Sequence, residues 1–181
     1  KIIQTNYVGP SLGQDSINSG SFSMIIGLAL ILIFMLLYYK ASGIIANIAL
    51  VINIIIIFAV LYTMNAVLTL PGIAGLLLTV GMSVDANVII FERIKEEIRS
   101  GKTIYASVNN GYKKAFVTIL DANITTLLTA FILSFIGSGP IKGFATTLSV
   151  GIFCSMFTAV FFTKTLFLTL LKKTKINKLS I

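Results

Sequence analysis

Two carboxylates in apolar surroundings, Asp85 and Asp121, are the residues of this chain best suited to proton chemistry. The sequence contains no histidine, so carboxylates are the strong acid–base groups left in its apolar segments. Asp85 is expected roughly 9 Å inside the end of its helix, because six residues separate it from Phe91. An unpaired, ionised carboxylate at that depth is costly, so Asp85 must be protonated, hydrated or paired with a cation.

The chain offers Asp85 no cation of its own, since no lysine or arginine lies at a comparable depth in the apolar segments. A cationic partner would therefore come from another subunit or from bound protons. Intramembrane carboxylates usually mark ion pathways. We predict that Asp85 belongs to a proton pathway; the alternative is a carboxyl group that only fixes helix packing through hydrogen bonds. Protons are then the coupling ion, and no metal or organic cofactor is predicted.

Asp121 lies a few residues into the next apolar segment, and we assign it a structural role. A carboxylate near a helix N-terminus is favoured by the unpaired N–H groups and by the helix dipole. The alternative is that Asp121 supports the proton pathway, together with four other candidate supporting polar residues: Asn87, Asn123, Thr125 and Thr126. Asn123 and Thr126 are expected to form hydrogen bonds with another helix.

The elements that position these residues must be membrane-spanning helices. The chain is 56% hydrophobic and only 11% charged, and a helix needs roughly 20 apolar residues to cross the hydrocarbon core. The apolar segments are continuous rather than alternating, which excludes a β-barrel. We predict an all-α, polytopic membrane bundle of about five helices. Their approximate limits are 20–39, 44–61, 69–91, 116–136 and 141–166.

The chain has a net charge of +8. Its basic residues are expected to lie mostly on one side of the membrane, which argues against a nucleic-acid partner. Threading five helices places every lysine and arginine except Lys1 and Lys142 on one side. By the positive-inside rule this side is cytoplasmic, so the N-terminus of the chain is expected outside and the C-terminus inside.

Polar segments predict the remaining organisation. We assign 1–19 to the tail of a periplasmic domain, 20–171 to the bundle and 172–181 to a basic cytoplasmic tail. The cytoplasmic loop 92–115 is expected to form one or two interfacial helices, broken at Gly101 and closed at 109–111. A connector that fixes topology is favoured over a docking segment.

Small residues at helical spacing predict close helix packing. The predicted packing residues are Gly75, Gly81, Gly143, Gly151 and Ser155. Gly81 lies one turn before Asp85, where the missing side chain leaves room for water or a neighbouring helix.

Four segments carry a family resemblance. They are LTLPGIAGLLLTVGMSVDANVIIFERIKEE (68–97), TILDANITTLLTA (118–130), GSGPIKGFATTLSVGI (137–152) and VGPSLGQDSI (8–17). Together they resemble the SecD/SecF family of the resistance-nodulation-division superfamily, and within it the SecD pattern rather than the SecF pattern. Because the segments occur in order, the resemblance covers nearly the whole chain.

This resemblance implies about five helices of a six-helix half in the bacterial inner membrane. It implies pairing with SecF beside the SecYEG channel, with YajC as a further partner and preproteins as substrates of the missing periplasmic domains. Asp85 matches the family's proton-pathway aspartate, and its cationic partner would belong to SecF. The function implied is use of the proton motive force to assist preprotein translocation, which makes the protein a transport subunit rather than an enzyme.

Two other functions fit parts of the sequence. An exporter of lipids or drugs would keep the same fold, but the SecD-like motifs in residues 68–97 argue against this function. An intramembrane aspartyl protease would require Asp85 and Asp121 within hydrogen-bond reach of each other. Neither aspartate lies in a Gly-x-Gly-Asp context, so the enzymatic reading is disfavoured.

Overall fold

The computed structural model describes residues 10–173, with side chains described over 18–172, and this part of the chain is helical with short connections. The elements are α1 (Pro10–Thr63), α2 (Leu70–Arg99), α3 (Ile104–Ile136), α4 (Pro140–Phe157), the π-helical turn η1 (Thr158–Phe162) and α5 (Thr163–Lys173). The all-α prediction is confirmed. Residues 1–9 of the predicted periplasmic tail and 174–181 of the basic tail lie outside the described residues. Residues 10–19, also assigned to the periplasmic tail, form the first turns of α1.

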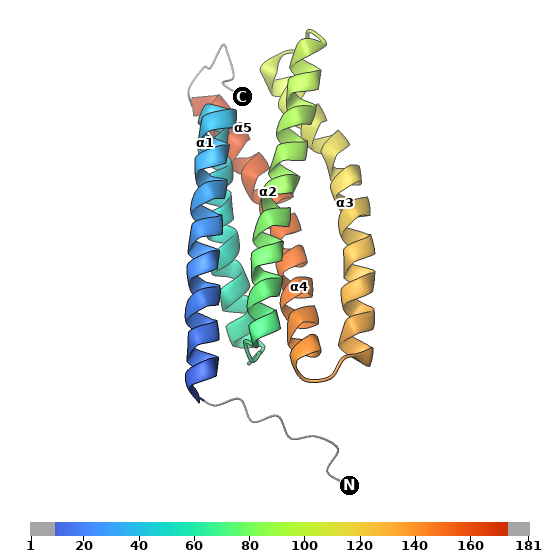
Figure 1. Cartoon of the computed structure of the whole chain (residues 1–181). Helices are drawn as coiled ribbons and strands as arrows, with labels where there is room; N and C mark the ends of the chain where they lie inside the picture. Colours follow the sequence, from blue (N-terminus) through green and yellow to red (C-terminus); the bar gives the residue numbers. More distant parts are fainter. Residues whose placement is uncertain (1–9, 174–181) are drawn as a thin grey trace.

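Helix α1 is a hairpin of two antiparallel arms that meet at Lys40, whose backbone is non-helical (φ 50°, ψ −119°) (Figure 1). Gly43 permits this tight reversal, because a Cβ at that position would collide with the main-chain carbonyl of Met35. The Asn47 side chain also joins the arms by donating to the carbonyl of Leu32 at 3.1 Å.

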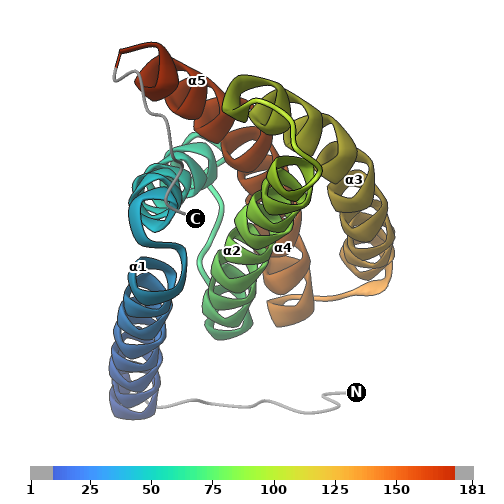
Figure 2. The same ribbon diagram turned by 90° about the horizontal axis from the view of Figure 1, so that it is seen from above.

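The chain therefore passes along the bundle five times. The arms of α1 give two passes, α2 and α3 give one each, and α4, η1 and α5 form one continuous rod (Figure 1). Helix α2 lies between α1 and α3, with α4 beside it (Figure 2). We call the end that carries Lys40, Arg99, Lys102 and Lys172 the lysine-rich end; the start of α1 and Lys142 lie at the opposite end.

Helices α2 and α4 interlock through three pairs of one glycine and one threonine: Gly75 with Thr147, Gly143 with Thr69, and Gly151 with Thr79. A Cβ on Gly75 would lie 2.6 Å from the Thr147 hydroxyl, and one on Gly151 would collide with Thr79. Ser155 is buried on α4. Gly81 differs, since a Cβ there would meet nothing within 4 Å. Among the described helices, none packs against Gly81.

The segment 92–115 is mostly helical, because α2 and α3 extend beyond the limits expected for the membrane spans. The break falls at Gly101 (φ 83°), as expected, and Thr103 caps α3 by accepting from the amide of Ala106. The expected closure at 109–111 is wrong, because the helix continues through it. Gly111 packs directly on Ile94, where a Cβ would come within 2.9 Å of the backbone nitrogen.

The main core lies toward the lysine-rich end. Phe91 and Ile94 of α2 and Val108 of α3 are fully buried. The Phe91 ring contacts the rings of Tyr39 and Phe167, with centroids 5.2 and 5.8 Å apart. These contacts bring α1, α2 and α5 together. They fix the position of the end of α2 that follows Asp85 in the sequence.

Candidate functional site

Asp85 lies on a face of α2 that is left uncovered by the other helices in the described part of the chain. Its side chain is exposed, while the flanking Val84 and Ala86 are buried. Among the described residues, Asp85 has no hydrogen-bond or ion-pair partner. An unpartnered carboxyl group in the apolar part of a spanning helix is unfavourable in lipid. The face that carries it is thus better suited to another protein or to water than to acyl chains.

The uncovered face of α2 is a stripe of four residues at helical spacing: Ala74, Leu78, Gly81 and Asp85. Leu78 is 48% exposed, and the space beside Gly81 is open. A small residue one turn before the carboxylate leaves a shallow notch in the helix surface. A helix from another subunit could approach closely there and place a cation against Asp85.

Asn87 faces the other way, into the bundle. Its Nδ2 donates to the carbonyl of Ser83 at 3.2 Å, and its Oδ1 is buried without a partner among the described residues. The structure therefore does not bring Asn87 to Asp85. Asn53 of α1 is also fully buried, and neither polar atom of its side chain has a partner within the described part of the chain. The position of Asn53 midway through an apolar segment predicts a hydrogen bond to another helix, and among the described residues its side chain makes none.

Asp121 does not lie at a helix N-terminus, so the reason given for its structural role is wrong. Helix α3 begins at Ile104, which places Asp121 well inside it, with an exposed side chain. Thr103, not Asp121, supplies the cap. The helix starts earlier than predicted because its first turns pack on α2 through Gly111.

The polar residues that follow Asp121 form hydrogen bonds within their own helix. Asn123 donates to the carbonyl of Ile119 at 2.7 Å, and Thr125 and Thr126 both donate to the carbonyl of Ala122. Among residues 18–172, Asn123 and Thr126 make none of the expected hydrogen bonds to another helix. Helix α3 also buries the smallest share of its apolar stretch of any spanning helix described, so much of its surface is open to a partner or to lipid.

The two aspartates do not form a dyad in this chain. Neither Asp85 nor Asp121 makes a hydrogen bond to any group within the described residues. The geometry that an aspartyl protease requires is therefore absent from this arrangement.

Glu97 organises the connection between α2 and α3. Its side chain is almost completely buried, and each carboxylate oxygen pairs with a lysine at 2.5 Å, one with Lys102 and one with Lys114. Charge-assisted bonds of this kind are stronger than neutral ones. Lys114 is far from Glu97 in sequence, so no local pattern indicated this contact. The pair of lysines fixes the extended ends of both helices.

A second cluster fastens the turn of α1 to α2. Glu92 accepts from the Tyr39 hydroxyl at 3.1 Å and from Lys95 at 2.9 Å. The Lys95 ammonium also lies 4.6 Å from the centre of the Tyr39 ring, a cation–π arrangement. Glu96 pairs with Arg93 at 2.8 Å. Every glutamate of α2 therefore has a cation nearby, and Asp85 is the carboxylate of this helix that lacks one among the described residues.

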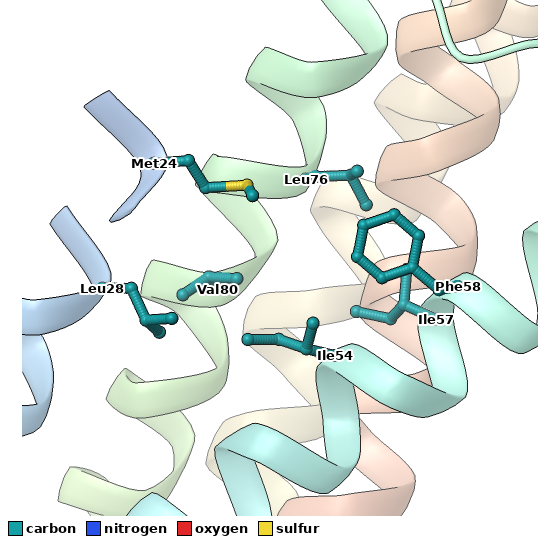
Figure 3. Close-up of a pocket in the computed structure, with 7 residues that line it drawn as sticks. All are labelled: Met24, Leu28, Ile54, Ile57, Phe58, Leu76 and Val80. Carbon is teal, nitrogen blue, oxygen red and sulfur yellow. The ribbon is translucent and has the colours of Figure 1, made fainter. Parts of the chain in front are cut away.

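An apolar cavity of about 70 Å³ lies between the two arms of α1 and α2, and Figure 3 shows its lining. The lining side chains are Met24, Leu28, Ile54, Ile57, Phe58, Leu76 and Val80. None of them carries a charged or hydrogen-bonding group. The cavity is therefore a packing gap without the chemistry to hold a polar ligand, and it is separate from the face that carries Asp85.

Comparison with known proteins relates this arrangement to one family. Residues 1–173 match the family model described as "Protein export membrane protein SecD/SecF, C-terminal". The chain is 55% identical over 181 residues to the protein translocase subunit SecD of Calditerrivibrio nitroreducens. It is 56% identical over 180 residues to that of Desulfurispirillum indicum. It covers 100% and 99% of itself in these matches but only 35% of each relative.

A solved structure has the same arrangement of helices. It is the crystal structure of SecDF, a translocon-associated membrane protein from Thermus thermophilus. The match has a TM-score of 0.90 and 40% sequence identity, and it covers 94% of this chain and 24% of that one. The chain thus spans about a third of its curated relatives and about a quarter of this structure.

Proposed function

The chain belongs to the SecD/SecF family of protein export membrane proteins, and from this premise we propose that it is the membrane-embedded C-terminal part of a SecD subunit. In this proposal it pairs with SecF and uses the proton motive force to assist preprotein translocation through SecYEG, with YajC as a further partner. The relatives named as protein translocase subunits support this assignment, as does the translocon-associated SecDF structure.

The observation that carries the proposal is the position of Asp85. It is exposed on a spanning helix and has no partner among the described residues. Lipid is a poor environment for this group, and a partner subunit that brings a cation would stabilise its ionised form. The notch at Gly81 gives such a subunit room to approach. SecF is the partner whose pairing the family resemblance implies.

The proposed mechanism depends on the protonated and the ionised state of the Asp85 side chain. A protonated Asp85 is neutral and tolerates separation from a cation, whereas the ionised form favours close contact. Loading and release of a proton would therefore shift the equilibrium between two packings of the SecD and SecF bundles. In the full-length subunit that we propose, the periplasmic domains implied by the family resemblance would be attached to this bundle. A change in bundle packing would then move the part that holds the emerging preprotein.

We also propose the bacterial inner membrane as the location, with the lysine-rich end in the cytoplasm. The turn of α1, the connection between α2 and α3, and the end of α5 all lie at that end (Figure 1). They carry most of the basic residues. The positive-inside rule then directs the start of α1 to the periplasm.

Cross-linking tests the proposed contact of the Asp85 face with SecF. The full-length protein is expressed with SecF after Cys154→Ser, and Leu78→Cys is introduced on the exposed stripe. We expect oxidative cross-links from this cysteine to cysteines scanned along the SecF helices, because Leu78 lies about one helical turn from Gly81. Phe153→Cys on α4, which is 64% exposed but lies on another helix, is the matched control.

Equal cross-linking from Leu78→Cys and Phe153→Cys would contradict a contact centred on α2. Absence of any cross-link from Leu78→Cys, in a complex that still copurifies with SecF, would place the interface elsewhere and remove the proposed cation from Asp85.

A further inference from the structure

A groove at the lysine-rich end lies between α3 and the rod formed by η1 and α5, with a volume of about 420 Å³. Its lining includes Asn110, Lys113 and Phe116 from α3, and Val160, Phe161 and Lys164 from the rod. The groove therefore combines two cations and an amide with a set of apolar side chains. It is remote in sequence from Asp85 and plays no part in the proton pathway proposed above.

The backbone of the rod shapes this groove. Residues 158–162 form a π-helical turn, a rare feature that often occurs at functional sites. Just beyond it, the hydroxyl of Tyr112 donates to Thr163 Oγ1 at 2.8 Å, in a buried contact that fixes α3 to α5. The groove is thus held open between two helices that are firmly joined at its base.

The two cations of the groove have no acidic partner in the part of the chain that the structure describes. The salt bridges of this end use Arg93, Lys95, Lys102 and Lys114. Within the described residues, Lys113 and Lys164 have no carboxylate within 4.0 Å, and the side chain of Asn110 makes no hydrogen bond. The three glutamates of this end are already paired. An external anion is therefore the remaining partner for these donors.

The apolar lining identifies the kind of anion. Phe161 is 62% and Phe116 38% exposed, so both rings offer surface to a ligand beside the cations. A free phosphate has no apolar part that could contact these rings, whereas the acyl chains of a phospholipid could pack on them. Basic pockets between spanning helices on the cytoplasmic side bind anionic lipid head groups. We propose that this groove binds an anionic phospholipid, with its phosphate between Lys113 and Lys164 and its chains along the aromatic rings.

Native mass spectrometry of the purified full-length complex, titrated with phosphatidylglycerol, tests the proposal. The variant Lys113→Gln/Lys164→Gln should bind the first phosphatidylglycerol about 25-fold more weakly, since one basic residue near a membrane contributes roughly five-fold. The pair Lys40→Gln/Lys172→Gln removes the same charge from the same end outside the groove and should change binding by less than about two-fold. Lys113→Arg/Lys164→Arg keeps both charges and should retain binding.

Three results would overturn the proposal. Equal losses in the groove pair and the outside pair would indicate diffuse surface charge. Equal affinity of the wild type for phosphatidylcholine and phosphatidylglycerol would remove the anionic requirement. Displacement of phosphatidylglycerol by millimolar inorganic phosphate would indicate a site for the free ion rather than for a lipid.

Discussion

Replacing Asp85 by asparagine in the full-length protein is expected to abolish the proton-gradient-dependent part of preprotein secretion. Asparagine keeps the size of the side chain but cannot load or release a proton. Positioned proton-transfer groups typically contribute roughly 100-fold or more to the steps they serve, so the gradient-dependent component should fall by about that factor. Secretion of a reporter preprotein is measured with and without an uncoupler, and the difference between the two rates is the relevant quantity.

Glu96→Gln is the matched control for this experiment. It also converts a carboxylate to an amide on α2, but Glu96 is exposed and paired with Arg93, and exposed pairs contribute little. Its gradient-dependent secretion should equal that of the wild type. A fully active Asp85→Asn protein would show that Asp85 serves packing alone and that coupling resides elsewhere in the complex.

The second large effect is expected from Gly151→Val. A side chain at this position would collide with Thr79, at one of the three glycine–threonine contacts that join α2 and α4. Overpacking of a well-packed core typically costs about 1–3 kcal/mol. In a chain of this size, about 2–4 °C of melting temperature is lost per kcal/mol. The melting temperature of the membrane bundle, followed in the full-length protein in detergent, should therefore fall by roughly 2–12 °C.

Gly81→Val separates this packing effect from the general cost of valine in a helix. A Cβ at Gly81 meets nothing within 4 Å, so the melting temperature of the subunit alone should be nearly unchanged. Copurification with SecF should weaken instead, because the same valine would fill the proposed notch. A lower melting temperature for Gly81→Val than for Gly151→Val would contradict the assignment of these glycines to different surfaces.

The spans could be predicted because apolar length is a local property of the sequence. The division of α1 near Lys40 followed from a lysine between two apolar segments, and the small residues of α2 and α4 appeared at helical spacing. The family resemblance rested on continuous motifs and agrees with the family that the comparisons identify.

Features that depend on contacts between distant segments could not be predicted in this way. The continuation of α3 through 109–111 results from the contact of Gly111 with Ile94. The pairing of Glu97 with Lys114 likewise requires the α2–α3 turn to be in place first. The charged segment before Asp121 favours a helix boundary close to this residue, whereas Thr103 provides the actual cap.

The surroundings of Asp85 include one feature that could be predicted from the sequence and one that could not. Its depth followed from its distance to Phe91 along the chain, but its exposure depends on which face of α2 the other helices cover. Gly81 was predicted to leave room for water or a helix, and within this chain the space beside it is open. The orientation of Asn87 away from that face could not be known before the bundle was assembled.

Proton movement across a membrane that contains the reconstituted full-length protein and its partners tests the central claim most directly. Proteoliposomes with an internal pH dye are subjected to an imposed proton gradient, and the rate of internal acidification is recorded. We predict that Asp85→Asn lowers the protein-dependent rate by roughly 100-fold, while Glu96→Gln leaves it unchanged. An Asp85→Asn complex that carries protons at the wild-type rate would contradict the account.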